Sequence, residues 1–294
     1  MIVAVATAGT PVRLRVMPMG ELLDETFKLY RRHFTVIAGV AIVIILPNLI
    51  LSLISGSYRA NPFTYVQDVL QNINNPDQLA AVQARQSQYT SSPLYLLSFP
   101  IAALLIPFSV GALYRAATSL AAGNLETLGS VLAGTARRYF AVWGIVILGA
   151  LVAIGSIGIV TIPVVLWVLI RWSVAIPALF AEGVGPVKAL GRSWNLVRDN
   201  WWRTLGILII VTIMVSLIQT ALATLFGGAA ALVPGLNGDI RAGIVTTVTT
   251  LIDALVGAIQ PIAITLLYLD LRVRKEGLDL DQLARQAAPG TAPA

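Results

Sequence analysis

The stretch LLYLDLRVRKEGLDLDQL (266–283) is where a long apolar run changes, within a few residues, into a dense mixture of acids and bases. This change is expected where a membrane-spanning helix leaves the hydrocarbon, because its bases then meet anionic headgroups and the negative end of the helix dipole. We therefore expect Tyr268 to lie at the membrane interface and Gly277 to end the helix. Asp270 and Glu276 are expected to pair with the neighbouring bases.

The composition of the whole chain agrees with a membrane protein. Its 294 residues are 57% hydrophobic and 12% charged, with a mean hydropathy of +0.81. A soluble domain carries about 25% charged residues, so this chain lacks the polar surface that covers a water-exposed globule. The net charge of +6 comes from short basic clusters beside apolar runs, which argues against nucleic-acid binding. Without cysteine, the chain has no disulfide and no thiolate metal site.

Six runs are apolar enough and long enough to cross a bilayer as helices, which takes about 20 residues each. They lie at about 36–55, 93–115, 140–160, 161–181, 204–226 and 243–269. The predicted fold is therefore all-α: a polytopic membrane bundle of about six transmembrane helices. The polar segment 56–92 is expected to be an outer loop with short helices that begin near Asn61 and Asn75.

Basic residues are distributed unequally between the two sides that these spans define. Three lie on one side: Arg59, Arg85 and Arg241. Sixteen lie on the other: Arg13, Arg15, Lys28, Arg31, Arg32, Arg115, Arg137, Arg138, Lys188, Arg192, Arg198, Arg203, Arg272, Arg274, Lys275 and Arg285. Because basic loops stay inside the cell, this asymmetry predicts a multi-pass protein of the cell (plasma) membrane with both termini in the cytoplasm.

Three amphipathic stretches precede the odd-numbered spans on the predicted cytoplasmic side. They are 20–34, 124–140 and 185–202, and they contain the basic and aromatic sequences YRRHF, RRYF and VRDNWW. We predict three interfacial helices. The second is expected to start at Asn124, and the third to carry Val187 on its apolar face. The bases and aromatics either only anchor these helices at the interface or bind lipids and partner proteins.

The recurrence of an interfacial helix, a span and a return span predicts a threefold internal repeat. Its units would be 20–123, 124–184 and 185–277. Together they form a single predicted membrane domain over 17–283.

The two ends of the chain are expected to lie outside this domain. In residues 1–16 no basic region precedes the short apolar stretch, so they do not resemble a signal peptide. They are interpreted either as a flexible leader or as a segment upstream of a start near Met17. Residues 284–294 are expected to form a disordered tail.

Two ionisable residues, Arg171 and Asp253, are expected near the middle of spans four and six. A charge at that depth costs about 2.5–3.5 kcal/mol, so it usually faces the bundle interior and has a partner. We therefore hypothesise an Arg171–Asp253 ion pair, which either locks helices together or lines a path for a substrate. A structure that separates the two charged groups beyond ion-pair range would exclude it. Further polar residues on stripes expected to face other helices are Thr249, Thr250, Gln260, Ser216 and Gln219.

Bases at the ends of the interfacial helices and of the last span are candidates for contact with lipid headgroups. They are Arg31, Arg32, Arg137, Arg138, Arg198, Arg272, Arg274 and Lys275. Membrane lipids are thus the expected partners, and other membrane proteins are further candidates.

The sequence contains no pattern for catalysis or cofactor binding. His33 is the single histidine, and one histidine without cysteines or paired acids does not make a recognisable zinc site. No GxSxG elbow, P-loop or HExxH motif occurs. We expect a protein that is not an enzyme and binds no cofactor or metal.

Three stretches resemble the signatures of one bacterial family. MPMGELLDETFKLYRRHF (17–34), ALGRSWNLVRDNWWRTLGIL (189–208) and PIAITLLYLDLRVRKEGLDL (261–280) are similar to integral membrane proteins labelled glycerophosphoryl diester phosphodiesterase membrane domain. The resemblance covers about residues 17–283 and implies a polytopic helical membrane protein. The phosphodiesterase activity in the label belongs to a separate soluble domain that uses His, Glu and Asp with a metal. The resemblance carries no catalytic residue over to this chain.

Two functions follow from these features. The first is a non-enzymatic membrane component that docks partners or lipids at its cytoplasmic face. The second is a transporter of small solutes or lipids, or a subunit of one, with a polar interior around Arg171 and Asp253. A water-filled cavity at these residues would favour transport, whereas a closed bundle with a flat basic inner face would favour docking.

Overall fold

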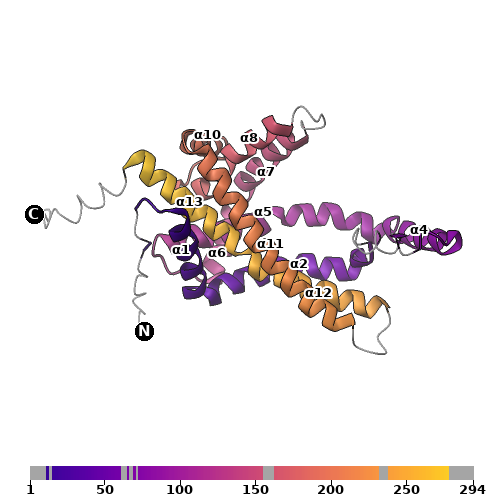
Figure 1. Ribbon diagram of the computed structural model, residues 1–294. Helices are drawn as coiled ribbons and strands as arrows, with labels where there is room; N and C mark the ends of the chain where they lie inside the picture. Colours follow the sequence, from indigo (N-terminus) through magenta and orange to yellow (C-terminus); the bar gives the residue numbers. More distant parts are fainter. Residues whose placement is uncertain are drawn as a thin grey trace, which may run out of the picture. The chain divides into compact units, whose positions relative to one another are not determined.

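The computed structural model describes residues 11–12, 15–60, 65, 69–70, 72–154, 162–231 and 238–277. The regular structure of these residues is helical throughout, which confirms the predicted all-α class. In chain order (Figure 1) the helices are α1 (Met19–Arg32), α2 (Phe34–Ser55), the 3₁₀ helix η1 (Ser57–Ala60), α4 (Pro76–Thr90), α5 (Pro93–Ala121), α6 (Leu128–Arg137), α7 (Tyr139–Ile154), α8 (Ile162–Trp172), α9 (Ala175–Glu182), α10 (Pro186–Val197), α11 (Trp201–Ala231), α12 (Gly238–Gly257) and α13 (Ile259–Glu276).

Within the described residues, five stretches are long and apolar enough to cross a membrane. They are Phe34–Ser55, Pro93–Ala121, Ile162–Glu182, Trp201–Phe226 and Ile240–Glu276, and they correspond to five of the six predicted spans. The remaining prediction, 140–160, falls on α7. This helix has 16 residues and reaches spanning length only together with α6, from which it is bent by 64°. The end of that predicted span lies outside the described residues.

Large apolar side chains are exposed along these stretches. Ile54 is 67% exposed, and Leu217 and Leu225 are each 65% exposed. In water such exposure would be unfavourable, but lipid is as apolar as these side chains, and a helix satisfies its own backbone hydrogen bonds there. The protein is therefore a multi-pass membrane protein.

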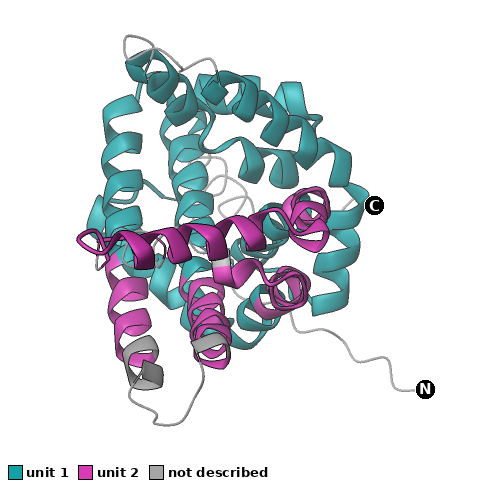
Figure 2. Cartoon of the chain, turned by 90° about the vertical axis from the view of Figure 1, so that its right-hand side faces the viewer, with its two compact units in different colours: residues 1–41, 107–216, 257–294 teal, residues 42–106, 217–256 magenta. Residues whose placement is uncertain are grey.

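The chain divides into two compact units, each made of separate segments (Figure 2). Unit 1 combines residues 1–41, 107–216 and 257–294, and unit 2 combines residues 42–106 and 217–256. The boundaries fall inside α2, α5 and α11, so these helices contribute to both units. The threefold repeat inferred from the sequence stays a prediction.

Helix α13 is the central helix of unit 1. Every side chain from Ile262 to Tyr268 is buried, and so are Leu271 and Val273. Because these residues lie on all sides of the helix, α13 needs protein neighbours all round. Helices α1, α9 and α10 pack against it. The C-terminal end of α13, with its dense charges, is thereby held among other elements of unit 1.

Two prolines explain where two of the predicted spans break. Pro177 provides no N–H for the carbonyl of Ser173, and Pro261 provides none for the carbonyl of Gly257. The break between α8 and α9 lies at Ser173, and the break between α12 and α13 directly follows Gly257. The predicted span 243–269 is therefore two helices joined by a break.

The three predicted amphipathic helices are present as α1, α6 and α10, and an apolar helix follows each within a few residues. The predicted start of the second at Asn124 is wrong. Thr127 caps α6, because its Oγ1 accepts from the amide of Ser130 and the Ser130 Oγ accepts from the amide of Thr127. The predicted place of Val187 is also wrong: it is 71% exposed, since the buried face of α10 begins at Ala189.

The outer loop and the leader are described in part. Asn75 caps α4 through a hydrogen bond from the amide of Gln78, which confirms the helix start predicted there. The start predicted near Asn61 lies outside the described residues, and so does the tail 284–294. In the leader, the amide of Val12 donates to the carbonyl of Ala121.

Candidate functional site

The charges at the end of α13 form two clusters within unit 1. In the first, the Glu182 carboxylate accepts hydrogen bonds from Arg192 Nε at 2.7 Å and from the Tyr268 hydroxyl at 2.8 Å. Glu276 accepts from Arg272 Nε at 3.0 Å and also pairs with Arg192. The cluster joins α9, α10 and α13. Tyr268 is fully buried, so its ring contributes to the core while its hydroxyl belongs to the cluster.

The second cluster surrounds Asp270, which is 0% exposed. Its carboxylate accepts from the backbone amide of Met17 at 2.8 Å, from Arg203 Nη2 at 3.0 Å and from Arg274 Nε at 2.9 Å. Both arginines also donate to the carbonyl of Met17. A buried carboxylate needs such partners, and losing one side of a buried pair costs about 3–5 kcal/mol. Asp270 therefore fixes the segment before α1 against α11 and α13.

These clusters confirm that Asp270 and Glu276 pair with neighbouring bases and that Gly277 ends α13, in the left-handed conformation at φ 63°. They also engage bases for which lipid contact was predicted. Arg272 and Arg274 are bound as above, and Lys275 lies 2.9 Å from Asp199. Their contact with headgroups stays a prediction.

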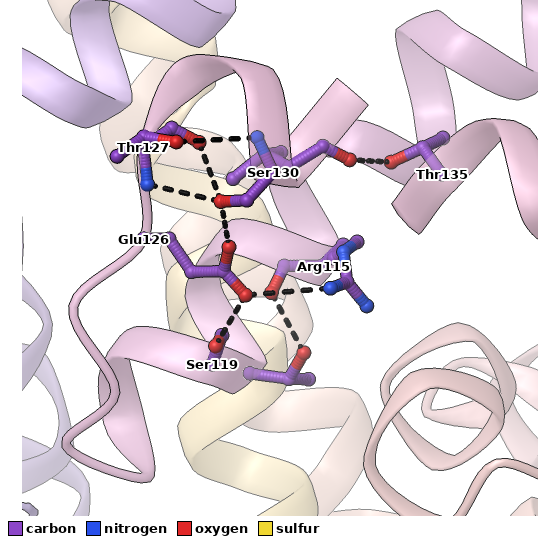
Figure 3. Close-up of polar contacts among 8 residues, drawn as sticks. Arg115, Ser119, Glu126, Thr127, Ser130 and Thr135 are labelled. Carbon is purple, nitrogen blue, oxygen red and sulfur yellow. Dashed lines mark hydrogen bonds and ion pairs between the residues drawn. The ribbon is translucent and has the colours of Figure 1, made fainter. Parts of the chain in front are cut away.

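A third cluster connects the end of α5 to the start of α6 (Figure 3). Glu126 accepts from the Ser119 hydroxyl at 2.8 Å and from the Ser130 hydroxyl, and it lies 3.4 Å from the Arg115 guanidinium. The Arg115 side chain crosses α6 at Gly134, where a Cβ would lie 2.0 Å from Arg115 Nε. The cluster is a structural connection between the two helices.

Arg171 is held between two tryptophans of unit 1. Its guanidinium carbon lies 4.1 Å from the ring centre of Trp167 and 4.5 Å from that of Trp194. The two rings meet edge to face with their centres 5.1 Å apart. Cation–π contacts of this kind contribute from about 0.5 to 2 kcal/mol, more when the charge is desolvated. The Arg171 Nε is buried and has no hydrogen-bond partner within the described part of the chain.

Ser193 and Trp201 fix the end of α8, where Arg171 is found. The Ser193 hydroxyl donates to the carbonyl of Arg171 at 2.7 Å and accepts from the amide of Val174 at 3.2 Å. These are backbone groups that the break between α8 and α9 leaves without helical partners. The Trp201 indole N–H donates to the carbonyl of Trp167 at 3.3 Å. The position of Arg171 is thus set by α8, α10 and α11 together.

Arg171 faces an open pocket of about 620 Å³ in unit 1. The lining residues come from α8, from the turn between α10 and α11, and from the start of α11: Trp167, Arg171, Arg198, Asp199, Asn200, Trp201, Trp202 and Arg203. The wall contains three arginines and one acid. The hydrogen bond from Lys275 holds the pKa of the Asp199 carboxyl below its usual value. Asp199 is thus ionised and already neutralised at pH 7.

A second pocket, of about 590 Å³, lies beside α1. Arg15, Lys28, Arg31 and Arg32 contribute to its lining. Among these bases, Arg15 pairs with Glu21, and Lys28 Nζ lies 2.7 Å from Asp24. This pocket therefore offers less unpaired charge than its composition suggests.

The predicted polar stripes of spans five and six meet at one hydrogen bond among the described residues. In unit 2 the Gln219 side chain donates to the backbone carbonyl of Asp253 at 3.4 Å. Asp253 and Ser216 are exposed. The Thr249 hydroxyl donates to the carbonyl of Val245 in its own helix. The other predicted stripe residues, Thr250 and Gln260, are half-buried.

The Arg171–Asp253 ion pair stays a prediction. The two residues belong to different units, Arg171 to unit 1 and Asp253 to unit 2. Sequence reasoning identified Arg171 from its isolation in an apolar run, but it missed Trp167 and Trp194 as its neighbours. The i, i+4 spacing of Trp167 and Arg171 was a signal for one of these contacts.

Comparison with known proteins gives one match. Residues 145–287 match the family described as membrane domain of glycerophosphoryl diester phosphodiesterase. No curated protein and no solved structure matches the chain. The matched range contains the whole lining of the Arg171 pocket and two of the three sequence signatures, whereas the signature at 17–34 lies outside it. Over residues 145–287, the chain is therefore similar to the family of glycerophosphoryl diester phosphodiesterase membrane domains.

Proposed function

We propose that this protein is a non-enzymatic component of the plasma membrane, with both termini in the cytoplasm, that docks anionic lipids at the cytoplasmic face of unit 1. The observation that carries this proposal is the orientation of the three short helices α1, α6 and α10. Each buries its apolar face within unit 1 and leaves bases exposed.

The buried faces pack on protein. Leu22 and Leu29 of α1 are buried, as are Val131 of α6 and Leu190 and Leu196 of α10. Since these faces are already covered, the amphipathic pattern does not require that the helices insert into lipid. What remains for an external partner is the opposite, basic side.

Four of the exposed bases lie just before the start of an apolar helix, and the fifth, Lys188, lies in the first turn of α10. They are Arg31, Arg32, Arg137, Lys188 and Arg198. A base close to an anionic membrane surface contributes about 1 kcal/mol of attraction. Several such bases on one face therefore favour a leaflet rich in anionic lipid, which agrees with the positive-inside distribution of the whole chain.

Docking is preferred to the transport alternative for a specific reason. The charge of Arg171 has favourable contacts with Trp167 and Trp194 within unit 1. It therefore does not need Asp253 as a partner. The open pocket beside Arg171 is not lined by Asp253, so it does not meet the criterion for transport, which is a cavity that reaches both residues.

The proposal is tested by the lipid selectivity of the full-length protein in bilayers of phosphatidylglycerol and phosphatidylcholine. Electron spin resonance of spin-labelled lipids reports which lipid is immobilised at the protein surface. We expect selection of phosphatidylglycerol, reduced in high salt because exposed charges are screened. Replacing Arg31, Arg32, Arg137 and Lys188 by Gln together should remove most of it.

The matched control is Arg85→Gln, which removes an exposed base from α4 in the outer loop. It should leave the selectivity unchanged. Equal selectivity in the wild type and in the fourfold variant would show that the cytoplasmic bases do not dock lipid.

A further inference from the structure

We infer that the pocket around Arg171 binds the phosphate of an anionic lipid headgroup. This inference rests on the proposed function in one respect, since it places the pocket at the level of the cytoplasmic headgroups. It adds a defined site and a ligand chemistry, carried by the lining residues rather than by the outward bases of the short helices.

The pocket has a preorganised cation. Arg171 is fixed by the two tryptophan rings, and the end of α8 is fixed by Ser193 and Trp201. A guanidinium that is already ordered loses little conformational entropy when it binds an anion. Its side chain donates no hydrogen bond to another described residue, and Nε alone of its nitrogens is buried without a partner, so the Nη atoms keep their donor capacity for a ligand. Planar guanidinium donors match the oxygens of phosphate.

A second arginine, Arg198, is exposed and lines the same pocket. Among the described residues, neither Arg198 nor Arg171 lies within ion-pair distance of an acid, although both attract the Asp199 carboxylate at longer range. The other charges of the wall are engaged: Arg203 with Asp270, and Asp199 with Lys275. The pocket therefore presents two unpaired positive charges to a ligand.

The backbone adds donors of the same kind. Helix α11 begins at Trp201, and its first three residues, Trp201, Trp202 and Arg203, line the pocket. The first amides of a helix have no acceptor within it, and its dipole attracts negative charge there. The first helical bond of α11 is the one from Thr204 to the carbonyl of Asn200. Amides 201–203 thus precede the first internally bonded residue and supplement the two arginines.

The position in the membrane points to a lipid as the source of the phosphate. Trp201 is the first residue of a candidate span, and Trp202 is 78% exposed. Tryptophans at the ends of spans lie at headgroup level. The two rings meet edge to face at 4.7 Å and form one apolar wall of the pocket, next to which acyl chains would begin. The hydrogen bond from Trp201 to the Trp167 carbonyl holds the end of α8 beside the start of α11. Because α8 ends at Trp172, we place Arg171 at this level and not in the middle of the membrane as the sequence predicted, so Ile162–Glu182 would not cross the bilayer as one span. A phosphate at Arg171 would then be at the depth of lipid phosphates.

The charges also specify which headgroup fits. The single carboxylate in the wall, Asp199, is already bound by Lys275 at 2.9 Å. An ammonium group in the headgroup would meet no free acid among the described lining residues, and it would meet two unpaired arginines. Phosphatidylglycerol should therefore bind more tightly than phosphatidylethanolamine.

The test is native mass spectrometry of the full-length protein in detergent, with each lipid titrated separately. Arg198→Gln is the main variant, because this side chain is exposed and its removal leaves the fold intact. Arg171→Gln is the second variant. Each should weaken phosphatidylglycerol binding by about tenfold, the effect of losing one charge-assisted hydrogen bond. The control Arg85→Gln should bind like the wild type, and phosphatidylethanolamine should bind more weakly and respond little to any of the variants.

Three outcomes would overturn the inference. If Arg198→Gln binds phosphatidylglycerol as the wild type does, the pocket is not the site. The proposed function then still stands if the fourfold Arg31, Arg32, Arg137 and Lys188 variant loses its lipid selectivity. If inorganic phosphate displaces the lipid and binds as tightly, the ligand is a soluble phosphate. If phosphatidylethanolamine binds equally well, the charge argument for headgroup choice fails.

Discussion

Ser193 illustrates how one side chain satisfies backbone groups that a helix break leaves without partners. Pro177 interrupts the hydrogen bonding between α8 and α9, and a break inside a membrane domain leaves backbone groups that lipid cannot satisfy. Ser193 is fully buried, and its hydroxyl donates to the carbonyl of Arg171 and accepts from the amide of Val174. An alanine has no such donor or acceptor.

We therefore predict that Ser193→Ala lowers the free energy of unfolding by about 1–3 kcal/mol, the cost of leaving buried polar groups unsatisfied. Thermal unfolding of the purified protein in detergent measures this loss. Ser87→Ala is the matched control, because Ser87 is exposed on α4 and bonds only the carbonyl of Ala84 in the described contacts. A Ser193→Ala melting temperature equal to that of the control would contradict the role given to Ser193.

His33 lies at the break between α1 and α2, and burial, with a smaller contribution from Arg32, lowers its pKa below the ordinary value of 6.5. A base whose pKa is lower in the folded state makes folding less favourable as the pH falls below 6.5. Well above pH 7, the imidazole is neutral in both states and the effect vanishes.

Since His33 is the single histidine, the imidazole NMR signal of the histidine-labelled protein belongs to it. We expect its titration midpoint below 6.5. Replacing His33 by Gln should reduce the loss of stability on acidification just below that pH. A midpoint at or above 6.5 would mean that the folded protein does not disfavour the charged form.

At the scale of elements, α6 contains two glycines with opposite surroundings. A Cβ at Gly134 would overlap the Arg115 side chain, whereas a Cβ at Gly129 would meet nothing within 4 Å. Gly134→Ala should therefore displace Arg115 from Glu126 and destabilise the protein by about 1–2 kcal/mol. Gly129→Ala should stabilise α6 by about 0.5–1 kcal/mol, because alanine is the better helix former. Denaturation measures the change in the free energy of unfolding for each variant. If both variants are stabilised, or both destabilised, this account of α6 is wrong.

The sequence predicts elements better than it predicts their partners. Hydrophobic periodicity predicts α1, α6 and α10, since this signal is local. Prolines are a weaker signal, because Pro177 and Pro261 follow breaks whereas Pro47, Pro100 and Pro107 lie inside continuous helices. Several partners of the charged residues are remote. Asp270 and Met17 are 253 positions apart, and Lys275 and Asp199 are 76 positions apart. The pairing of Arg274 with Asp270 is local, at i, i+4, and was predicted, whereas charge alone suggested lipid for Lys275 and the fold supplies Asp199.

At the scale of the whole molecule, the same limit applies to Arg171. Its depth in an apolar run indicated a charged partner in another span, and Asp253 was the one at a similar depth. Depth along the chain says nothing about which helices are neighbours, and it does not distinguish a carboxylate from two tryptophan rings as the stabilising contact. The pocket, too, needs residues from α8, from α11 and from the turn before it, so no local pattern reveals it.

The positive-inside distribution makes a prediction for the complete chain. Because the sequence has no cysteine, a single introduced cysteine is the one site for a maleimide. Ala136→Cys is exposed on α6, beside the basic Arg137, and Ser87→Cys is exposed on α4 in the outer loop. A membrane-impermeant maleimide should label Ala136→Cys in inside-out vesicles and Ser87→Cys in intact cells, since sixteen bases are counted on the first side and three on the second. The cysteine-free parent is the control and should remain unlabelled. The reverse pattern would put α1, α6, α10 and the Arg171 pocket on the outer surface, and both the docking proposal and the assignment of the pocket to cytoplasmic headgroups would then be wrong.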